Sequence, residues 1–255
     1  MRRIAVGAVV LNLAILAMRC SSAVTTDPPP GPTPPGTSPL RVLVVTATAG
    51  FRHDSIAAAR QTIQTLATQT GTFTPTFTEN LADLSATRFA ATDVLMFVLT
   101  SGELALDAGQ KAALLAFVQN GGGFIGVHSA TDTLYDWPEY GRLVGAYFKE
   151  HPWTQDATVA VEDRGHVSTS ALGSSFRLME EYYTFREDPR PVVHVLLSLD
   201  ASSVGASGDF PLSWTQTVGQ GRSFYTALGH FAATWADTRF MSHISGAIRS
   251  VGKRE

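Results

Sequence analysis

The chain has 255 residues, of which 44% are hydrophobic and 16% are charged, and its formal net charge at pH 7 is −3. This size and composition are typical of a globular protein that buries a sizeable core. Because the chain has no run of basic residues, we expect neither nucleic acid nor an anionic membrane surface to be a partner.

The beginning of the chain is typical of a secretory signal. Residues 1–3 (MRR) are positively charged, and residues 4–18 are almost wholly apolar, a stretch too short for a stable membrane span. We therefore expect residues 1–23 to be a signal peptide that exports the protein to the periplasm or the extracellular space. Cys20 can instead mark a lipid-attachment site, but Arg19 directly before it fits such a site poorly.

The next stretch is predicted to be a linker, residues 24–40. Its part from 27 to 39 contains seven prolines and two glycines, and such a segment cannot build a core. Residues 41–255 would then form one domain. Because Cys20 is the only cysteine of the chain, this domain has neither a disulfide nor a thiol nucleophile, which suits an exported bacterial protein.

From residue 41 onward, strand and helix patterns alternate. Apolar or alternating runs predict strands at 41–46, 73–78, 93–100 and 124–127, and amphipathic runs predict helices at 55–68 and 108–119. Further along we expect a helix at 137–148, a loop at 151–153, strands at 157–162, 179–185, 192–199, 211–218 and 222–227, and a closing helix at 237–251. This order predicts an α/β fold with a mostly parallel sheet, helices on both faces and an antiparallel extension.

One stretch, residues 121–132 (GGGFIGVHSATD), carries the main functional signal. Three glycines suit the end of a helix and a turn, and the apolar run after them suits a buried parallel strand. His128 and Asp132 follow this strand directly. Since ligands bind at the carboxyl ends of strands in such sheets, both are candidates for chemistry, although Asp132 can also be a simple helix cap.

Five motifs together resemble a known family. They are GFRHDSI (50–56), GGGFIGVHSATD (121–132), DWPEYGRLVGAYFKEHP (136–152), EEYYTF (180–185) and GRSFYTALGH (221–230). In this order they resemble the ThuA-like family, named for trehalose utilisation. The resemblance implies the fold of class I glutamine amidotransferases, a flavodoxin-like three-layer sandwich, and a link to disaccharides or oxidised (keto) glycosides.

The chain departs from the family's pattern in three places. His166-Val167 and Phe210-Pro211 stand where the family usually has a His-Pro pair. The run 180–183 is Glu-Glu-Tyr-Tyr in place of Asp-Glu-Trp-Tyr. We therefore assign no role to Phe210, and these departures leave open whether the substrate is the same as that of other members.

The resemblance also places His128 at an informative position. In class I glutamine amidotransferases a cysteine nucleophile occupies the sharp turn after the central strand, and His128 stands there in this chain. The protein is therefore not expected to be a cysteine glutaminase, while an imidazole at this point can act as a base or a metal ligand. Ser129 is an alternative nucleophile, but no triad is evident for it.

The candidate site residues fall into two groups. The candidate catalytic residues are His128, Glu181 and Asp132. The candidate substrate-binding residues are His53, Arg52, His151, Tyr182, His230 and Trp137. Glu181 matches the family's glutamate, whereas the adjacent Glu180 faces the other side of the strand. Arg52 can also simply pair with Asp54, and aromatic residues such as Tyr182 and Trp137 are commoner in a core than in a sugar-stacking wall.

We expect the histidines and carboxylates of these groups to converge at one end of the sheet. Several imidazoles and a carboxylate would bind a divalent metal such as zinc. No tight ligand spacing is present in the sequence, however, which favours a polar pocket without a metal. The sequence therefore leaves the cofactor unassigned.

Two classes of function remain open. The first is an exported carbohydrate-active enzyme, a hydrolase or lyase that binds a small sugar and transfers protons through His128 and Glu181. The second is a non-catalytic sugar-binding or scaffold domain of the cell envelope. The sequence decides neither the oligomeric state nor the bond that is broken.

The signal peptide gives a first prediction. We expect the native protein to lack about its first 23 residues and to be found outside the cytoplasm, because the charged start and the apolar run direct export and cleavage. Mass spectrometry of the intact native protein measures this. A cytoplasmic protein that retains Met1 would contradict it.

Overall fold

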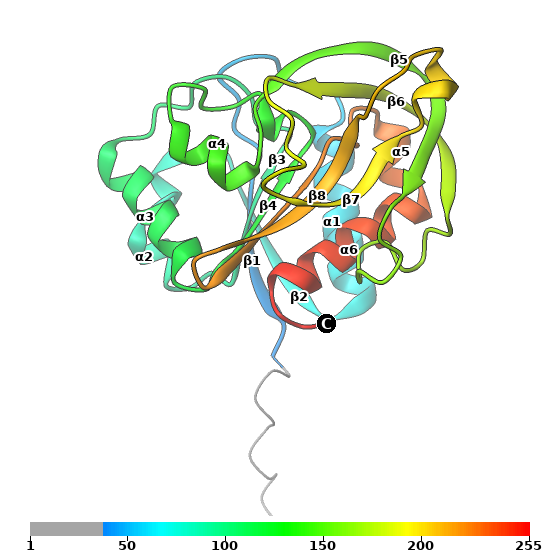
Figure 1. Cartoon of the computed structure of the whole chain (residues 1–255). Coiled ribbons are helices and arrows are strands. Elements are labelled where there is room, and N and C mark those ends of the chain that lie inside the picture. The colour runs from blue at the N-terminus through cyan, green and yellow to red at the C-terminus, as the bar shows by residue number, and fades with distance from the viewer. Residues whose placement is uncertain (1–37) are drawn as a thin grey trace, which may run out of the picture. The chain divides into compact units, whose positions relative to one another are not determined.

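A sheet of nine strands lies at the centre of the computed structural model, which describes residues 38–255. The predicted signal peptide and most of the predicted linker lie outside the described residues. The order of the strands is β2-β1-β3-β4-β9-β8-β7-β5-β6, and Figure 1 shows them between two groups of helices. The fold is therefore α/β, as the sequence predicts.

The first half of the sheet is parallel. It contains β1 (Leu40–Val45), β2 (Phe73–Thr78), β3 (Val94–Val98), β4 (Gly123–Val127) and β9 (Gly221–Thr226). Strands β3 (VLMFV) and β4 (GFIGV) are buried along their whole length. Such continuous apolar runs are typical of parallel strands that helices cover on both faces.

The second half is antiparallel. It contains β5 (Phe148–Val161), β6 (Ser175–Phe185), β7 (His194–Leu199) and β8 (Pro211–Val218). Strand β8 pairs with β9 through a hairpin, with Gly219 in the left-handed conformation (φ 61°) that its turn requires. The sheet has four parallel and four antiparallel pairings. The expectation of a mostly parallel sheet is thus wrong, because the late strands return through hairpins instead of crossover helices.

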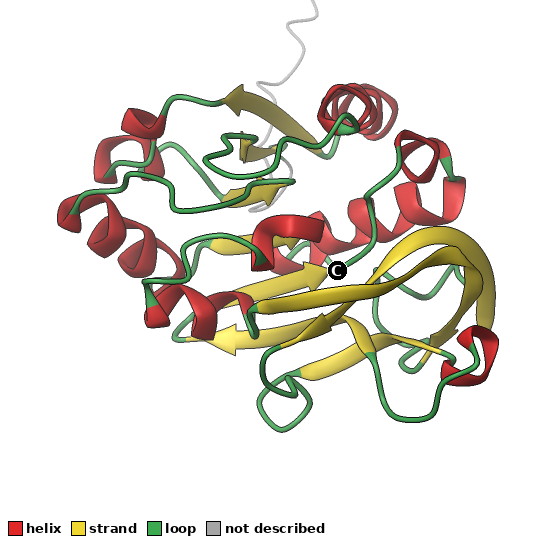
Figure 2. Cartoon of the chain, turned by 90° about the horizontal axis from the view of Figure 1, so that it is seen from above, coloured by secondary structure: helices red, strands yellow, loops and turns green. Residues whose placement is uncertain are grey.

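Helices cover both faces of the sheet. On one side, α1 (Ile56–Thr70), α5 (Ala232–Ala236) and α6 (Thr238–Val251) contact one another. On the other side, α2 (Ala86–Phe89) contacts α3 (Ala108–Gln119), which contacts α4 (Pro138–Val144). Figure 2 shows these groups with the strands between them. None of the helices within residues 38–255 has both the length and the apolar character to cross a membrane.

Local capping residues set the ends of α3 and α4. Helix α3 begins at Ala108 as predicted, because Asp107 and Gln110 form a capping box. The helix predicted at 137–148 ends instead at Val144, since Gly145 is left-handed (φ 102°) and terminates it. The sequence pattern missed the short helices α2 and α5.

The loop predicted at 151–153 is also wrong, because these residues belong to β5. Register shifts interrupt the pairing with β6 between Phe148 and Glu150 and between Glu150 and Trp153. Strand β5 pairs with β7 only over Val159–Val161. Pro152 therefore sits in an irregular stretch with one free edge, where the strand tolerates a missing N–H donor.

The fold predicts a specific pH dependence of stability. His243 of α6 is buried against Phe224, its Nδ1 lies 3.0 Å from the carbonyl oxygen of Ser168, and burial lowers its pKa to about 4. The unfolded chain therefore takes up this proton first as the pH falls. The contribution of His243 to the free energy of unfolding, up to about 3 kcal/mol, is complete above pH ~6.5 and is lost toward pH ~4.

Urea denaturation of the wild type and of His243→Asn at several pH values between 7 and 5 tests this expectation. Asn can still donate to the Ser168 carbonyl but has no proton to gain. We expect the stability difference between the two proteins to shrink as the pH falls. A difference that stays constant over this range would contradict the burial of a neutral His243.

Candidate functional site

The site begins at the carboxyl end of β4. His128 follows Val127 with a left-handed backbone (φ 54°) and opens the 3-10 helix η2 (His128–Thr131). A non-glycine residue rarely adopts this conformation, which here turns the chain sharply away from the sheet. Two buried hydroxyls stabilise the turn: Tyr225 donates to the carbonyl of His128 (2.8 Å) and Tyr140 to that of Ala130 (2.6 Å).

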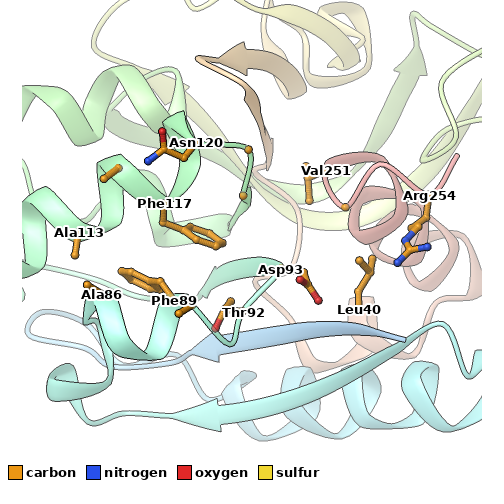
Figure 3. A pocket seen from close by; sticks show the side chains of 15 residues that line it. Leu40, Ala86, Phe89, Thr92, Asp93, Ala113, Phe117, Asn120, Val251 and Arg254 are labelled. Carbon is orange, nitrogen blue, oxygen red and sulfur yellow. The ribbon is translucent and has the colours of Figure 1, made fainter. Parts of the chain in front are cut away.

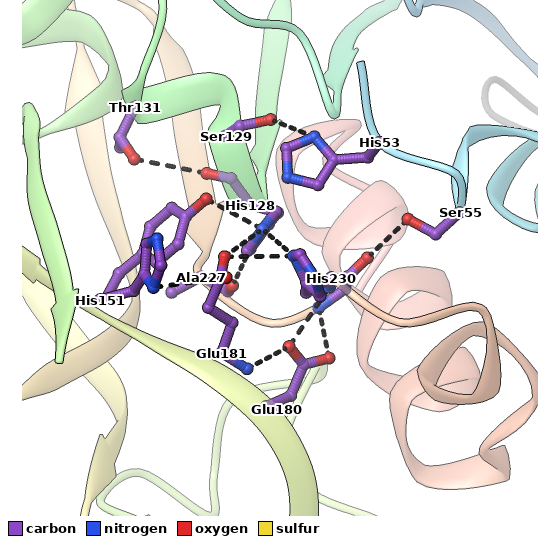
Figure 4. A network of polar contacts seen from close by, with 12 residues as sticks. His53, Ser55, His128, Ser129, Thr131, His151, Glu180, Glu181, Ala227 and His230 are labelled. Carbon is purple, nitrogen blue, oxygen red and sulfur yellow. Dashed lines mark hydrogen bonds and ion pairs between the residues drawn. The ribbon is translucent and has the colours of Figure 1, made fainter. Parts of the chain in front are cut away.

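The imidazole of His128 is at the centre of a polar network (Figure 4). Its Nδ1 lies 2.7 Å from the carbonyl oxygen of Ala227, which can only accept, so Nδ1 carries a hydrogen. In the neutral ring, Nε2 is therefore an unprotonated acceptor. It lies 2.9 Å from the hydroxyl of Tyr183, 3.2 Å from Nδ1 of His230 and 3.4 Å from Oε2 of Glu181.

Glu181 connects the histidines of the network. Its Oε2 also lies 3.1 Å from Nδ1 of His230, and its Oε1 lies 3.3 Å from Nδ1 of His151. Burial acts to raise the pKa of Glu181, but the contacts with His128 and His230 outweigh it and hold the pKa well below its usual value. The contact with Glu181 correspondingly raises the pKa of His230. Both directions follow because the carboxylate and the imidazole stabilise each other's charged forms.

His53 completes the cluster from the loop after β1. Its Nδ1 lies 3.5 Å from the hydroxyl of Ser129, and its ring centroid is 4.8 Å from that of His128 and 5.2 Å from that of His230. Burial, together with the neighbouring His128 and His230, lowers the pKa of His53 to about 3. His53 is therefore a neutral imidazole at pH 7.

Glu180, next to Glu181, holds the loop that carries His230. Its fully buried carboxyl group accepts hydrogen bonds from the backbone N–H groups of Gly229 (2.9 Å) and His230 (3.2 Å) and from the hydroxyl of Thr234. All three partners are donors on the segment after β9. Glu180 thus fixes this segment to β6 while Glu181 faces the histidines.

The structure brings only part of the predicted set together. His53, His128, Glu181 and His230 form the cluster, and His151, with 48% of its side chain exposed, contacts Glu181 at the rim. Asp132 lies just outside: it accepts a hydrogen bond from Tyr135 (2.7 Å), and burial raises its pKa.

Two predicted substrate-binding residues, Trp137 and Tyr182, lie apart from the cluster, and a third, Arg52, lies in the wall of the cavity beside His53. Arg52 pairs with Glu79 (2.8 Å) and not with Asp54. Trp137 is only 5% exposed and stacks on Tyr140 in the core. The hydroxyl of Tyr182, which is fully buried, donates to the carbonyl of Leu178 (2.7 Å).

Sequence reasoning missed Tyr183 and gave Glu180 no role. A signal for Tyr183 was present, because residues i and i+2 of a strand face the same side. Once Glu181 is placed in the site, Tyr183 belongs there and Tyr182 does not. No comparable signal identifies Glu180, whose partners come from a loop 50 residues further along the chain.

Two cavities lie at opposite ends of the sheet. One, of about 960 Å³, opens beside His53 and is lined by Arg52, Arg60, Phe77 and Glu79 among others. The other, of about 550 Å³, lies at the amino ends of β1, β3 and β4 and includes Phe89 and Phe117 (Figure 3). Because the second contains no residue of the cluster, the cavity beside His53 is the better candidate for a ligand.

Comparison with known proteins places this site in context. The model of a family described as "ThuA: Trehalose utilisation" matches residues 41–250. A ThuA-like protein of Bacteroides uniformis is 23% identical, with a TM-score of 0.70 over 86% of this chain and 94% of that one. A ThuA-like protein of Parabacteroides merdae is 20% identical, with a TM-score of 0.66 over 84% of this chain and 90% of that one.

A more distant likeness extends to a larger enzyme. A β-galactosidase from Rahnella sp. R3 is 15% identical, with a TM-score of 0.54 over 82% of this chain and 31% of that one. At such identities these likenesses concern the fold alone. A search among curated proteins found no match.

The role of Glu180 leads to a prediction about stability. Glu180→Gln keeps the shape of the side chain but turns an NH2 group toward N–H and O–H donors. We expect a loss of about 1–3 kcal/mol in the free energy of unfolding, as for a buried group left without its partner. Glu150→Gln, on the neighbouring strand with 56% of its side chain exposed, is the matched control and should change stability by less than about 0.5 kcal/mol. Equal values for both variants, from denaturant unfolding, would refute the role assigned to Glu180.

Proposed function

The chain belongs to the ThuA family, which places it broadly in trehalose utilisation, and from this premise we propose that it is an exported carbohydrate-active enzyme. The proposed substrate is a disaccharide or an oxidised (keto) glycoside. The proposed reaction is hydrolysis or elimination at the glycosidic bond by His/Glu acid–base chemistry.

The observation that carries the proposal is the contact of Glu181 with His128 and His230. The carboxylate of Glu181 lies 3.1 Å from the imidazole of His230 and 3.4 Å from that of His128, so it can pass a proton between them. In a keto sugar, the hydrogen on the carbon beside the carbonyl is acidic. A base of the cluster would take this proton, the electron pair would form the ring double bond, and an acid would protonate the departing oxygen.

The surroundings of the cluster support a sugar ligand. The cavity of about 960 Å³ beside His53 has room for one or two sugar rings. Arg52 and Arg60 on its wall supply donors for hydroxyl oxygens, and Phe77, under the guanidinium of Arg60 (4.9 Å), supplies an apolar face. His151 at the rim can exchange protons with solvent.

We also propose that the parallel half of the sheet has flavodoxin-like topology. Its order, β2-β1-β3-β4-β9, corresponds to the 2-1-3-4-5 order of that class when β9 takes the fifth place. In such a sheet the ligand binds outside the carboxyl ends of the strands, which is where His53 and His128 lie.

The test is turnover of a panel of glycosides and 3-keto-glycosides by the wild type, His128→Ala and Glu181→Gln. We expect both variants to lose at least about 100-fold in turnover, as for removal of a general acid or base. His194→Ala, with 61% of its side chain exposed, is the matched control and should keep wild-type rates.

Melting temperatures and sugar affinities of the same proteins complete the experiment. Tight sugar binding without turnover of any compound would support a non-catalytic binding domain instead. Wild-type turnover in both variants would remove the cluster from the reaction.

A further inference from the structure

We infer that His53, His128, Glu181 and His230 form a binding site for one divalent transition metal ion, such as zinc. The four side chains come from the loop after β1, the end of β4, strand β6 and the loop after β9. Each offers one ligand atom, and these atoms all lie within 4.8 Å of one another. The inference goes beyond the proposed function, since an ion can be bound and measured without any substrate.

The distances within the cluster fit a shared ion. Atoms bound tetrahedrally at about 2.0–2.1 Å from zinc lie roughly 3.3–3.4 Å from each other. The three separations among Nε2 of His128, Nδ1 of His230 and Oε2 of Glu181 are 3.1, 3.2 and 3.4 Å. The separations of 3.1 and 3.2 Å also suit hydrogen bonds from Nδ1 of His230. The separation of 3.4 Å between Nε2 of His128 and Oε2 of Glu181 is long for a hydrogen bond.

The orientation of the rings is fixed as in metal sites. Ligating histidines commonly donate their other N–H to a backbone carbonyl or a carboxylate. His128 does so through Nδ1 to Ala227 (2.7 Å), which turns the lone pair of Nε2 into the cluster. On His53, Nδ1 faces the hydroxyl of Ser129 (3.5 Å), which leaves Nε2 as the ligand. His151 contacts the outer oxygen of Glu181 (3.3 Å) and orients the carboxylate.

The donor set selects the class of ion. Three imidazoles and one carboxylate suit zinc and the neighbouring divalent transition metals, whereas magnesium and calcium prefer oxygen ligands alone. Because the three inner atoms lie within 3.4 Å of each other, the larger separations in the cluster involve His53. His53 therefore closes the site from the side of the cavity that it also lines.

Metal binding would change the roles of two residues. With an ion bound, His128 and Glu181 would serve as ligands, and the ion would supply acid–base chemistry by lowering the pKa of a water molecule. The hydroxyl of Tyr183, 2.9 Å from Nε2 of His128, would then lose this nitrogen as its acceptor.

The experiment is a zinc titration of the purified full-length protein after removal of metals with a chelator. Isothermal titration calorimetry should give one Zn²⁺ per chain, and zinc should raise the melting temperature because it binds the folded state. We expect His128→Ala, Glu181→Gln and His230→Ala to lower the affinity by more than about 100-fold, the upper end of the effect of losing a partner of a ligand. His230→Ala changes a partly exposed side chain, so the test holds even if His128→Ala fails to fold.

His194→Ala again serves as the control and should bind zinc as the wild type does. A wild type that binds no Zn²⁺, Co²⁺ or Mn²⁺, or binding that all three variants retain, would overturn the inference. A wild type that binds no ion but still turns over keto-glycosides would overturn the inference and leave the proposed function intact. Tight zinc binding without sugar turnover would support the metal site and contradict the proposed function.

Discussion

The left-handed backbone of His128 is the constraint on which the rest of the site depends. Such a conformation in a non-glycine residue costs about 1–3 kcal/mol. It persists because the turn is buried and because Tyr225 and Tyr140 donate to its carbonyl groups. Without this turn, the side chain of His128 would continue the alternation of β4 and point into a helix layer. With it, the imidazole lies beyond the end of the sheet, where other strands can reach it.

The second requirement is the shape of the antiparallel half. Strand β6 is the last strand of the sheet, five positions from β4, yet its Glu181 and Tyr183 contact His128. The long β5–β6 ribbon carries them back across the carboxyl ends of the parallel strands, as the curved strands in Figure 2 show. Register shifts in β5 near Glu150 and Trp153 are the local irregularities that allow such a strand to bend. The site thus lies between the two halves of one sheet.

In this arrangement the adjacent residues Glu180 and Glu181 have different roles. Because neighbouring residues of a strand face opposite sides, Glu181 enters the histidine cluster while Glu180 binds the backbone of Gly229 and His230. One carboxyl group therefore supplies chemistry, and the other positions a partner of that chemistry. The low pKa of Glu181 and the raised pKa of His230 are consequences of their closeness in a mostly buried space.

The sequence by itself determined the α/β class, the buried strands β3 and β4, the helix that begins at Ala108 and the importance of His128, because these depend on local patterns of apolar residues, caps and glycines. It did not determine how the second half of the chain pairs or that Tyr182 and Trp137 lie apart from the site. The positions of the strand ends predicted that His53, Glu181 and His230 lie near His128, but not which of their atoms approach one another or that Glu180 holds the segment of His230. Only the tertiary structure decided these points, because contacts between distant segments depend on strand order and on the bend of β5 and β6, which no local pattern encodes.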